Sequence, residues 1–422
     1  MANSRLSNPA IEAALTDPGF AIDPYSTYEL LRTDAPVYWS DAFNAWIVSR
    51  YSDVVDVLRD WRTFSNSGRI SSLLASFSDT DRARFSAIEE HFATGMVHAD
   101  PPDHTRLRRI VGHAFTNRTV QQLRPRIEQM VDDLLGAVST SGRIDLIADL
   151  AYPLPATVIG ELFGAPVQDA DLFKKWSSDI GSFQGAGQAD PEVMADATAA
   201  IVEMRDYFRA LAAAKATAPG DDLLSALVAP DAEPLTENEL LSFCVTMLTA
   251  GHETTTSLIG SGMLALLSHP RAFAELRRRP ETLETAVEEL LRFDSPLQRS
   301  WRRVSTDTRF GGETMTEGEL VVVFLGSANR DPDEFADADG LVIDREPNRH
   351  IGLGNGVHFC LGAPLARLEA QVAFRSLLHR FPDLALAATE INWNISGVFR
   401  CVRELPLTFT PVGRHQETST TA

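Results

Sequence analysis

Cysteine is scarce in this chain of 422 residues, and its three cysteines stand far apart. They are Cys244, Cys360 and Cys401, and no two lie within four residues of each other. The sequence therefore lacks the paired cysteines of a zinc half-site. Isolated cysteines are also typical of a reducing compartment, so we expect a cytoplasmic protein.

Long apolar runs are missing as well. No stretch of about 18 consecutive apolar residues occurs, so we expect no membrane-spanning helix. Residues 1–9 are polar and lack the apolar core of a signal peptide. No linker rich in glycine, serine or proline divides the chain, and no internal repeat is visible. The composition therefore marks no boundary between domains.

Positive charge is outnumbered, with 38 Lys and Arg residues against 58 Asp and Glu residues and a formal net charge of −20. Phosphate backbones repel such an excess of negative charge, which excludes general nucleic-acid binding. The charge mainly favours solubility.

The loop around Cys360 is rich in glycine, which stands on both sides of the sulfur at Gly352, Gly354, Gly356 and Gly362. Alternating glycines allow positive φ and let the backbone lie flat against a bulky group. No Lys-Ser or Lys-Thr follows, so the loop is not a phosphate-binding P-loop. Pro364 fits the first turn of a helix. Cys360 would then lie just before a helix N-terminus, where the dipole favours a thiolate.

A thiolate held in this way suits a metal ligand, and three interpretations of Cys360 fit the loop. A buried cysteine can be a small hydrophobic residue without chemistry. It can bind zinc, although the isolated cysteines of this chain disfavour that. A single cysteine ligand is the arrangement found in thiolate-ligated haem. The loop indicates haem, with the inert cysteine left as the alternative.

Five segments resemble the motifs of the cytochromes P450 and follow that family's order and spacing. They span the chain from about Pro101 to Cys360, and the pattern is most similar to the soluble bacterial members. Leu353 departs from it, because the family usually has Phe seven residues before the cysteine. We expect this difference to alter packing beneath the porphyrin. The segments are Pro101-Pro-Asp-His-Thr-Arg-Leu-Arg108, Ala250-Gly-His-Glu-Thr-Thr255, Glu289-Leu-Leu-Arg292, Ala328-Asn-Arg-Asp-Pro332 and the Cys360 loop.

The resemblance implies a mainly α-helical P450 fold with small β-sheets, in which residues 1–412 form a single haem-binding domain around a long central helix. We expect residues 413–422 to be a disordered tail. The central helix is visible in the sequence itself. Thr236 and Glu239 form a capping box, and Pro270 ends the apolar segment that follows, roughly 33 residues or ~50 Å later. We expect this helix to loosen at Gly251.

The resemblance also assigns the site. It implies haem b with Cys360 as the axial thiolate on the iron, and Ala250, Gly251 and Gly362 against the cofactor. Thr254 would order the protons that O2 activation needs, and Glu253 would relay them from solvent.

Further roles follow for charged residues. Two haem propionates would bind cationic or donor groups. The resemblance implies a buried, structural ion pair that fixes the loop before the cysteine. The expected propionate partners are His104, Arg108, Arg303 and His358, and the expected ion pair is Glu289 with Arg292.

The substrate side of the pocket is expected to be apolar and to include Met247, Ala250, Leu297 and Val398. A hydrophobic small molecule and O2 would be the substrates, with electrons from a ferredoxin and its reductase. Because ferredoxins are usually acidic, we expect a local basic face, for which Arg106, Arg109 and Arg367 are the candidates. We expect no nucleic-acid or membrane partner.

Three functions remain compatible with these motifs. The first is a monooxygenase that hydroxylates or otherwise oxidises its substrate, in bacterial secondary metabolism or catabolism. The second is oxidative coupling or ring closure without oxygen insertion. The third is a haem protein without catalysis, which Glu253 and Thr254 disfavour because a carrier needs no proton relay.

Overall fold

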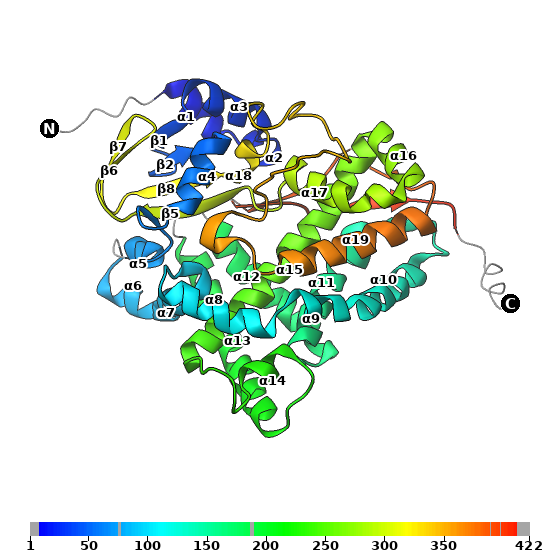
Figure 1. The fold of residues 1–422 in the computed structure, drawn as a ribbon, viewed down its shortest axis with the longest axis horizontal. Helices are drawn as coiled ribbons and strands as arrows, with labels where there is room; N and C mark the ends of the chain where they lie inside the picture. Colours follow the sequence, from blue (N-terminus) through cyan, green and yellow to red (C-terminus); the bar gives the residue numbers. More distant parts are fainter. Residues whose placement is uncertain (1–7, 75–76, 186–189, 389, 397, 412–422) are drawn as a thin grey trace.

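We describe the protein from a computed structural model, which places residues 8–74, 77–185, 190–388, 390–396 and 398–411. The expected disordered tail, residues 413–422, lies outside these ranges. The fold is mainly helical with small sheets, as the sequence predicts (Figure 1). No helix of the described residues is long and apolar enough to cross a membrane.

The α-helices of the described residues are α1 Pro9–Thr16, α2 Gly19–Ile22, α3 Tyr25–Asp34, α4 Tyr51–Arg59, α5 Arg69–Leu74, α6 Asp79–Arg84, α7 Ser86–Thr94, α8 Asp103–Ala114, α9 Asn117–Gln122, α10 Arg124–Val138, α11 Pro153–Leu162, α12 Ala170–Gly185, α13 Pro191–Thr217, α14 Leu223–Leu227, α15 Glu237–Ser268, α16 Pro270–Arg278, α17 Leu283–Phe293, α18 Leu325–Ala328 and α19 Ala363–Arg380. Short 3₁₀ turns occur at Met96–His98, Val167–Asp169, Pro280–Thr282 and Gly356–His358, and a π-helical turn at Ile147–Ala151.

The strands are β1 Val37–Ser40, β2 Ala45–Val48, β3 Phe64–Ser65, β4 Arg143–Asp145, β5 Arg299–Val304, β6 Thr308–Phe310, β7 Glu313–Met315, β8 Leu320–Phe324, β9 Ala385–Leu386, β10 Trp393–Ser396, β11 Phe399–Val402 and β12 Pro406–Thr408.

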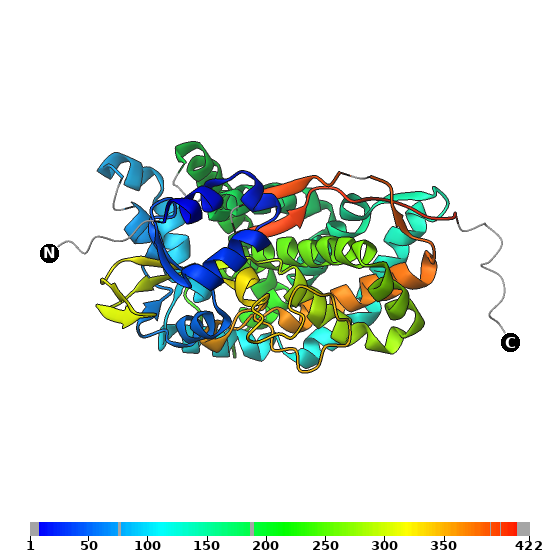
Figure 2. The same ribbon diagram turned by 90° about the horizontal axis from the view of Figure 1, so that it is seen from above.

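One sheet of five strands joins the N-terminal region to residues 299–324, in the order β1-β2-β8-β5-β3. Its middle strands, β2 and β8, are the two that β-branched and aromatic residues predict from the sequence. They run parallel, with Trp46 opposite Val321. The sheet and helices α1 and α3 lie together at one corner of the molecule, beside the helical part (Figures 1 and 2). The smaller sheets have the orders β10-β11, β4-β12-β9 and β6-β7.

The long helix α15 runs through the centre of the helical part (Figure 1). It has 32 residues, and the predicted capping box of Thr236 and Glu239 is present at its start. Pro270 follows its end and opens α16. Its side chains are buried on most faces, against α11, α12, α13, α19 and β11. A helix surrounded in this way is apolar all round, as the sequence indicated.

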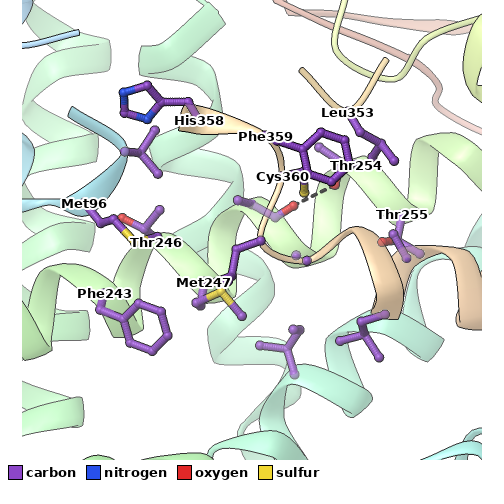
Figure 3. A pocket seen from close by; sticks show the side chains of 18 of the residues that line it. Met96, Phe243, Thr246, Met247, Thr254, Thr255, Leu353, His358, Phe359 and Cys360 are labelled. Carbon is purple, nitrogen blue, oxygen red and sulfur yellow. Dashed lines mark hydrogen bonds between the residues drawn. The ribbon is translucent and has the colours of Figure 1, made fainter. Parts of the chain in front are cut away.

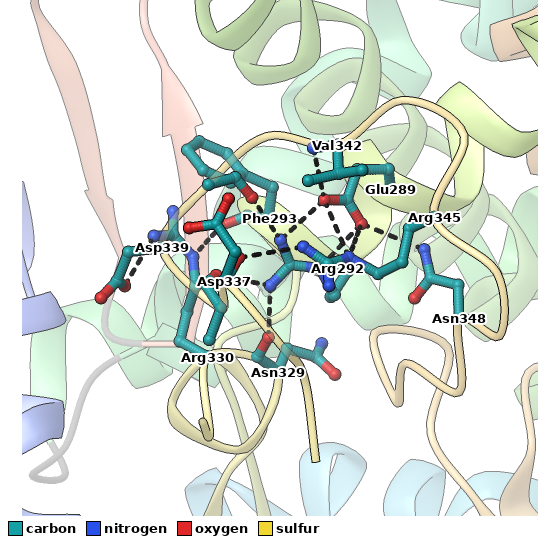
Figure 4. Close-up of polar contacts among 12 residues, drawn as sticks. Glu289, Arg292, Phe293, Asn329, Arg330, Asp337, Asp339, Val342, Arg345 and Asn348 are labelled. Atoms are coloured by element: carbon teal, nitrogen blue, oxygen red, sulfur yellow. Dashed lines mark hydrogen bonds and ion pairs between the residues drawn. The ribbon is translucent and has the colours of Figure 1, made fainter. Parts of the chain in front are cut away.

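Glu289 and Arg292 on α17 form a fully buried ion pair with two hydrogen bonds of 2.7 Å (Figure 4). Arg292 also donates to the carbonyl groups of Asn329, Ala338 and Gly340 at 2.7 to 2.8 Å. The side chain of Asn329 in turn accepts a hydrogen bond from the backbone N–H of Ile351, at the start of the Cys360 loop. One guanidinium thus ties α17 to the long segment that leads to the loop.

Replacing Arg292 with Leu should destabilise the haem-loaded protein by about 3–5 kcal/mol, because it leaves the buried Glu289 carboxylate with Arg345 as its remaining guanidinium partner. Urea unfolding measures the loss. Arg279→Leu is the matched control, since it breaks partly exposed ion pairs with Glu275, Glu281 and Asp344 and should cost much less. Equal losses in the two variants would contradict the structural role of the buried pair.

Candidate functional site

Two adjoining cavities lie between α15 and the Cys360 loop, with empty volumes of about 980 and 1570 Å³. Both are lined by Ala250, Thr254, Leu353, His358 and Cys360. Figure 3 shows the smaller cavity. Since they share these walls, the two cavities lie side by side in the space between α15 and the loop. The two walls come from segments more than a hundred residues apart in the chain.

The glycine-rich loop places Cys360 in this space. Gly354 and Gly356 have φ of +76° and +70°, the left-handed conformation that their spacing predicts. A Cβ at Gly356 would lie 2.7 Å from the carbonyl oxygen of Leu58, so the loop also packs closely on α4. The backbone N–H of Cys360 donates to the carbonyl of Leu353 at 2.9 Å, which closes the loop.

The Cys360 sulfur lies just before α19, which begins at Ala363 as expected. Burial raises the pKa of the thiol, and the backbone N–H groups of Gly362 and Ala363 and the charge of Arg108 oppose this rise. The helix start therefore does favour the thiolate, but burial outweighs it. Cys244 and Cys401 line neither cavity, so Cys360 alone of the three cysteines reaches this space.

Helix α15 supplies the opposite wall, through Met247, Ala250, Gly251 and Thr254. The Thr254 hydroxyl donates to the carbonyl of Ala250 at 2.7 Å. The helix remains α-helical throughout, so the expected loosening at Gly251 is not present. A Cβ on Gly251 would lie 2.8 Å from the Cδ1 of Ile159, and the glycine therefore lets α11 approach α15.

A third wall carries basic side chains from α8 and the loop. His104, Arg108 and His358 line the smaller cavity, and the centroids of the two imidazole rings are 4.3 Å apart. Burial lowers the pKa of His358 to about 3 and also lowers that of His104. Among the described residues, no group accepts from or donates to either ring nitrogen of His104 or the Nε2 of His358.

Comparisons with known proteins assign this architecture. The family model for cytochrome P450 matches residues 192–385. The chain is 42% identical to cytochrome P450 107B1 of Saccharopolyspora erythraea, over 93% of this chain and 96% of that protein.

The chain belongs to the cytochrome P450 family.

Solved P450 structures share the fold. The P450BioI complex with an acyl carrier protein ligated to hexadec-9Z-enoic acid has a TM-score of 0.86 and 35% identity, covering 92% of this chain and 99% of that chain. Myxobacterial CYP267B1 in complex with myristic acid has a TM-score of 0.84 and 39% identity, covering 94% and 99%. As a P450, the protein is an oxidoreductase that incorporates oxygen, and its cofactor is haem b with a cysteine thiolate ligand.

The cavity fits this cofactor. A thiol, apolar walls and a cluster of buried donors without protein partners meet in one space, and two propionates would satisfy those donors. Cys360, Gly362, Ala250, Gly251, His104, Arg108 and His358, all expected from the sequence, are brought together here.

Arg303, expected among the propionate partners, lines neither cavity, and the neighbouring Arg302 lines the larger one. Arg302 is 4% exposed, and burial lowers its pKa to about 10. Both residues lie on β5, where successive side chains point to opposite faces. A shift of one residue along the strand therefore changes which arginine faces the cofactor space.

Glu253 also lies differently from its expected place, because it lines neither cavity. Its carboxylate packs on α12, where a Cβ at Gly181 would lie 2.7 Å from both oxygens. Burial raises its pKa to about 7. Thr254 faces the cofactor space and Glu253 faces away from it, since consecutive helix residues differ by about 100° in direction.

Glu369 on α19 lines the smaller cavity near Cys360, and the sequence reasoning missed it. It is fully buried, burial raises its pKa well above the ordinary value, and neither carboxylate oxygen has a hydrogen-bond partner among the described residues. Its spacing could have revealed it. Leu365 and Val372 lie four residues before and three after it, on the apolar face of the same helix.

The expected substrate residues also line this space. Met247 faces the smaller cavity, whereas Leu297 and Val398 face the larger one. The roof comes from the segment before α8, through Phe92, Met96 and other residues. These apolar walls are those of a site for a hydrophobic ligand.

Glu253 should make stability depend on pH. Its pKa is about 7 in the folded protein, above the ordinary value of 4.5, so the folded state binds the proton more tightly. Stability should therefore fall as pH rises from about 4.5 to about 7, by up to about 3 kcal/mol. Glu253→Gln removes this titration, and its stability relative to the unaltered protein should rise across the same window.

Urea unfolding of the haem-loaded proteins at about pH 5 and about pH 8 measures the effect. The exposed Glu284 offers the matched control, because Glu284→Gln makes the same chemical change on the surface of α17. A Glu253→Gln difference that is the same at both pH values would show that this carboxylate titrates normally.

Proposed function

We propose that Cys360 is the axial ligand of haem b and that the enzyme inserts one atom of O2 into a hydrophobic small molecule. The observation that carries this proposal is the position of Cys360, the one cysteine of the three that lines the cavity, opposite Thr254. When bound there, the cofactor supplies the oxygen activation of the P450 family.

The side chains around the cofactor then have separate tasks. His104, Arg108, His358 and Arg302 would bind the propionates, because they are buried or half-buried donors in the same space. Ala250 and Gly251 would lie against the ring from the side of α15, and Gly362 from the side of α19. We also propose that residues 1–412 act as one domain, since α15 packs on elements from both halves of the chain.

Thr254 and Glu253 would handle protons at different places. The Thr254 hydroxyl already donates its hydrogen to Ala250, so its oxygen can accept a hydrogen bond from a water in the cavity. Glu253, with a pKa of about 7, can both hold and release a proton near neutral pH. Because Glu253 faces away from the cavity, water or a change of rotamer would have to connect the two residues.

The substrate would be a hydrophobic small molecule. The walls formed by Met247, Leu297 and Val398 are apolar. Similar proteins were solved with a fatty acyl group and with myristic acid, which supports a ligand with a large apolar body.

Electrons would come from a ferredoxin and its reductase, as is usual for bacterial P450s. The basic face expected at Arg106, Arg109 and Arg367 does not carry free charge, because each arginine forms an ion pair with a glutamate: Glu239, Glu233 and Glu288 respectively. A partner that docks there would have to compete with these pairs. The three free cysteines support a reducing, cytoplasmic setting.

The test is a reconstituted reaction with ferredoxin, its reductase, NADPH and isotopically labelled O2, on hydrophobic compounds first selected by their effect on the haem spin state. The product should gain one labelled oxygen atom. Cys360→Ser should lose both the product and the red-shifted carbon monoxide band of thiolate haem, and Cys401→Ser should keep both. A product that has lost two hydrogens and gained no oxygen would instead identify a coupling or ring-closing enzyme.

Thr254→Ala should uncouple electron use from product formation by roughly tenfold or more, because the cavity loses the hydroxyl that orders its water. Peroxide should rise in proportion. NADPH consumption, peroxide and product, measured together, give the coupling ratio. Thr256→Ala is the matched control, since its hydroxyl makes the same type of bond, to the His252 carbonyl at 3.0 Å, but lines neither cavity. Equal coupling in the two variants would remove Thr254 from the proton path.

A further inference from the structure

A cationic side chain without a partner faces the larger cavity from its roof. Arg69 is the first residue of α5 and lines this cavity together with Asn66 and His98. It does not line the smaller cavity, where His104 and Arg108 lie beside Cys360.

No acidic group compensates the charge of Arg69. Among the described residues, no hydrogen bond or ion pair holds its guanidinium. Burial alone lowers its pKa to about 10, and no carboxylate opposes this effect. Asp100 is engaged elsewhere, because it accepts hydrogen bonds from the Ser65 hydroxyl and the Asn66 N–H, and its charge raises the pKa of Arg302.

The positive charge of this wall is concentrated. Burial is the main cause that lowers the pKa of both His98 and Arg302, and Arg69 is close enough to lower the pKa of each further. Burying a guanidinium beside another one is unfavourable unless an anion binds between or next to them. A propionate on Arg302 would supply one such anion, and Arg69 would still have no acidic partner.

The haem propionates have other partners. His104 and Arg108 line the smaller cavity only, His358 lines both cavities beside Cys360, and Arg302 adjoins His358 in the larger one. Arg69 instead shares the larger cavity with apolar residues of the expected substrate side, including Phe92, Leu297 and Val398. Two propionates thus leave Arg69 for a group that enters with the substrate.

We propose that Arg69 binds a carboxylate of the substrate, and that this P450 acts on hydrophobic carboxylic acids. The proposal rests on the proposed function, since it names the substrate class of the same site. A guanidinium can hold a carboxylate through two parallel hydrogen bonds, while the apolar body lies along the neighbouring walls. A neutral analogue of the same shape would leave the buried charge unpaired.

Binding tests this directly, without turnover. Three pairs of probes are titrated into the haem-loaded protein while the spin-state change is recorded: dodecanoic acid, 4-phenylbutanoic acid and lithocholic acid, each with its methyl ester. At least one acid should bind roughly ten- to a hundredfold more tightly than its ester. Arg69→Gln should remove this preference and leave ester binding unchanged, and Arg69→Lys should keep part of it.

Arg62→Gln is the matched control, because it removes one positive charge from an exposed position shortly before Arg69 in the chain. It should keep the preference for the acid. Equal binding of acid and ester in all three pairs, or a preference that survives Arg69→Gln, would overturn the proposal.

Three further outcomes distinguish this proposal from a propionate-binding role of Arg69 and from the proposed function. If Arg69→Gln speeds haem transfer to apomyoglobin and no acid preference exists, Arg69 binds a propionate and the substrate proposal is wrong. If the acids show no preference while labelled oxygen still enters neutral compounds, the monooxygenase proposal stands and the carboxylate proposal fails. Acid binding that depends on Arg69 without any oxygen insertion would support the carboxylate site and contradict the proposed function.

Discussion

The buried contact of Glu289 with Arg292 is the constraint on which the site depends. Two charges with no exposure to solvent are stable there only because every donor of the guanidinium has an acceptor, on the carboxylate or on backbone carbonyls. Those carbonyls belong to the segment that leads to Ile351 and the Cys360 loop. The position of the sulfur relative to α15 therefore follows from an ion pair that touches neither cavity.

The same electrostatic principle explains why the cavity needs its cofactor. Buried imidazoles at His104 and His358 have no protein partners among the described residues, and Arg108 lies beside them. Burial lowers the pKa of each of these groups, which indicates that the protein alone does not stabilise their charged forms. Propionates would supply the missing acceptors, so we expect the protein to be more stable with haem bound between these three side chains than without it.

Features that act locally in the sequence, such as helix caps and prolines, predicted most of the fold. The site was predicted less completely, because parts of it depend on strand register and helix packing. Thr236 caps the start of α15 and Pro270 follows its end. Each residue affects only the helical turn next to it, so the sequence alone predicts both bounds. The choice between Arg302 and Arg303 depends on the register of β5, which the sequence of that strand does not determine alone. The direction of Glu253 depends on where α12 packs against α15, a tertiary contact that residue spacing cannot reveal.

The polar and charged groups of the cavity fall into two sets, one that would pair with the cofactor and one that would pair with the substrate. The Cys360 thiol, two imidazoles and Arg108 line the smaller space, and their number and chemistry match a dicarboxylate macrocycle with a central metal. Arg69 stands outside that group, on the roof next to apolar walls. A cofactor that is always bound would stabilise the first set permanently, whereas Arg69 would gain its partner only when substrate enters. Binding energy from that remote contact could then orient the apolar body of the substrate toward Thr254.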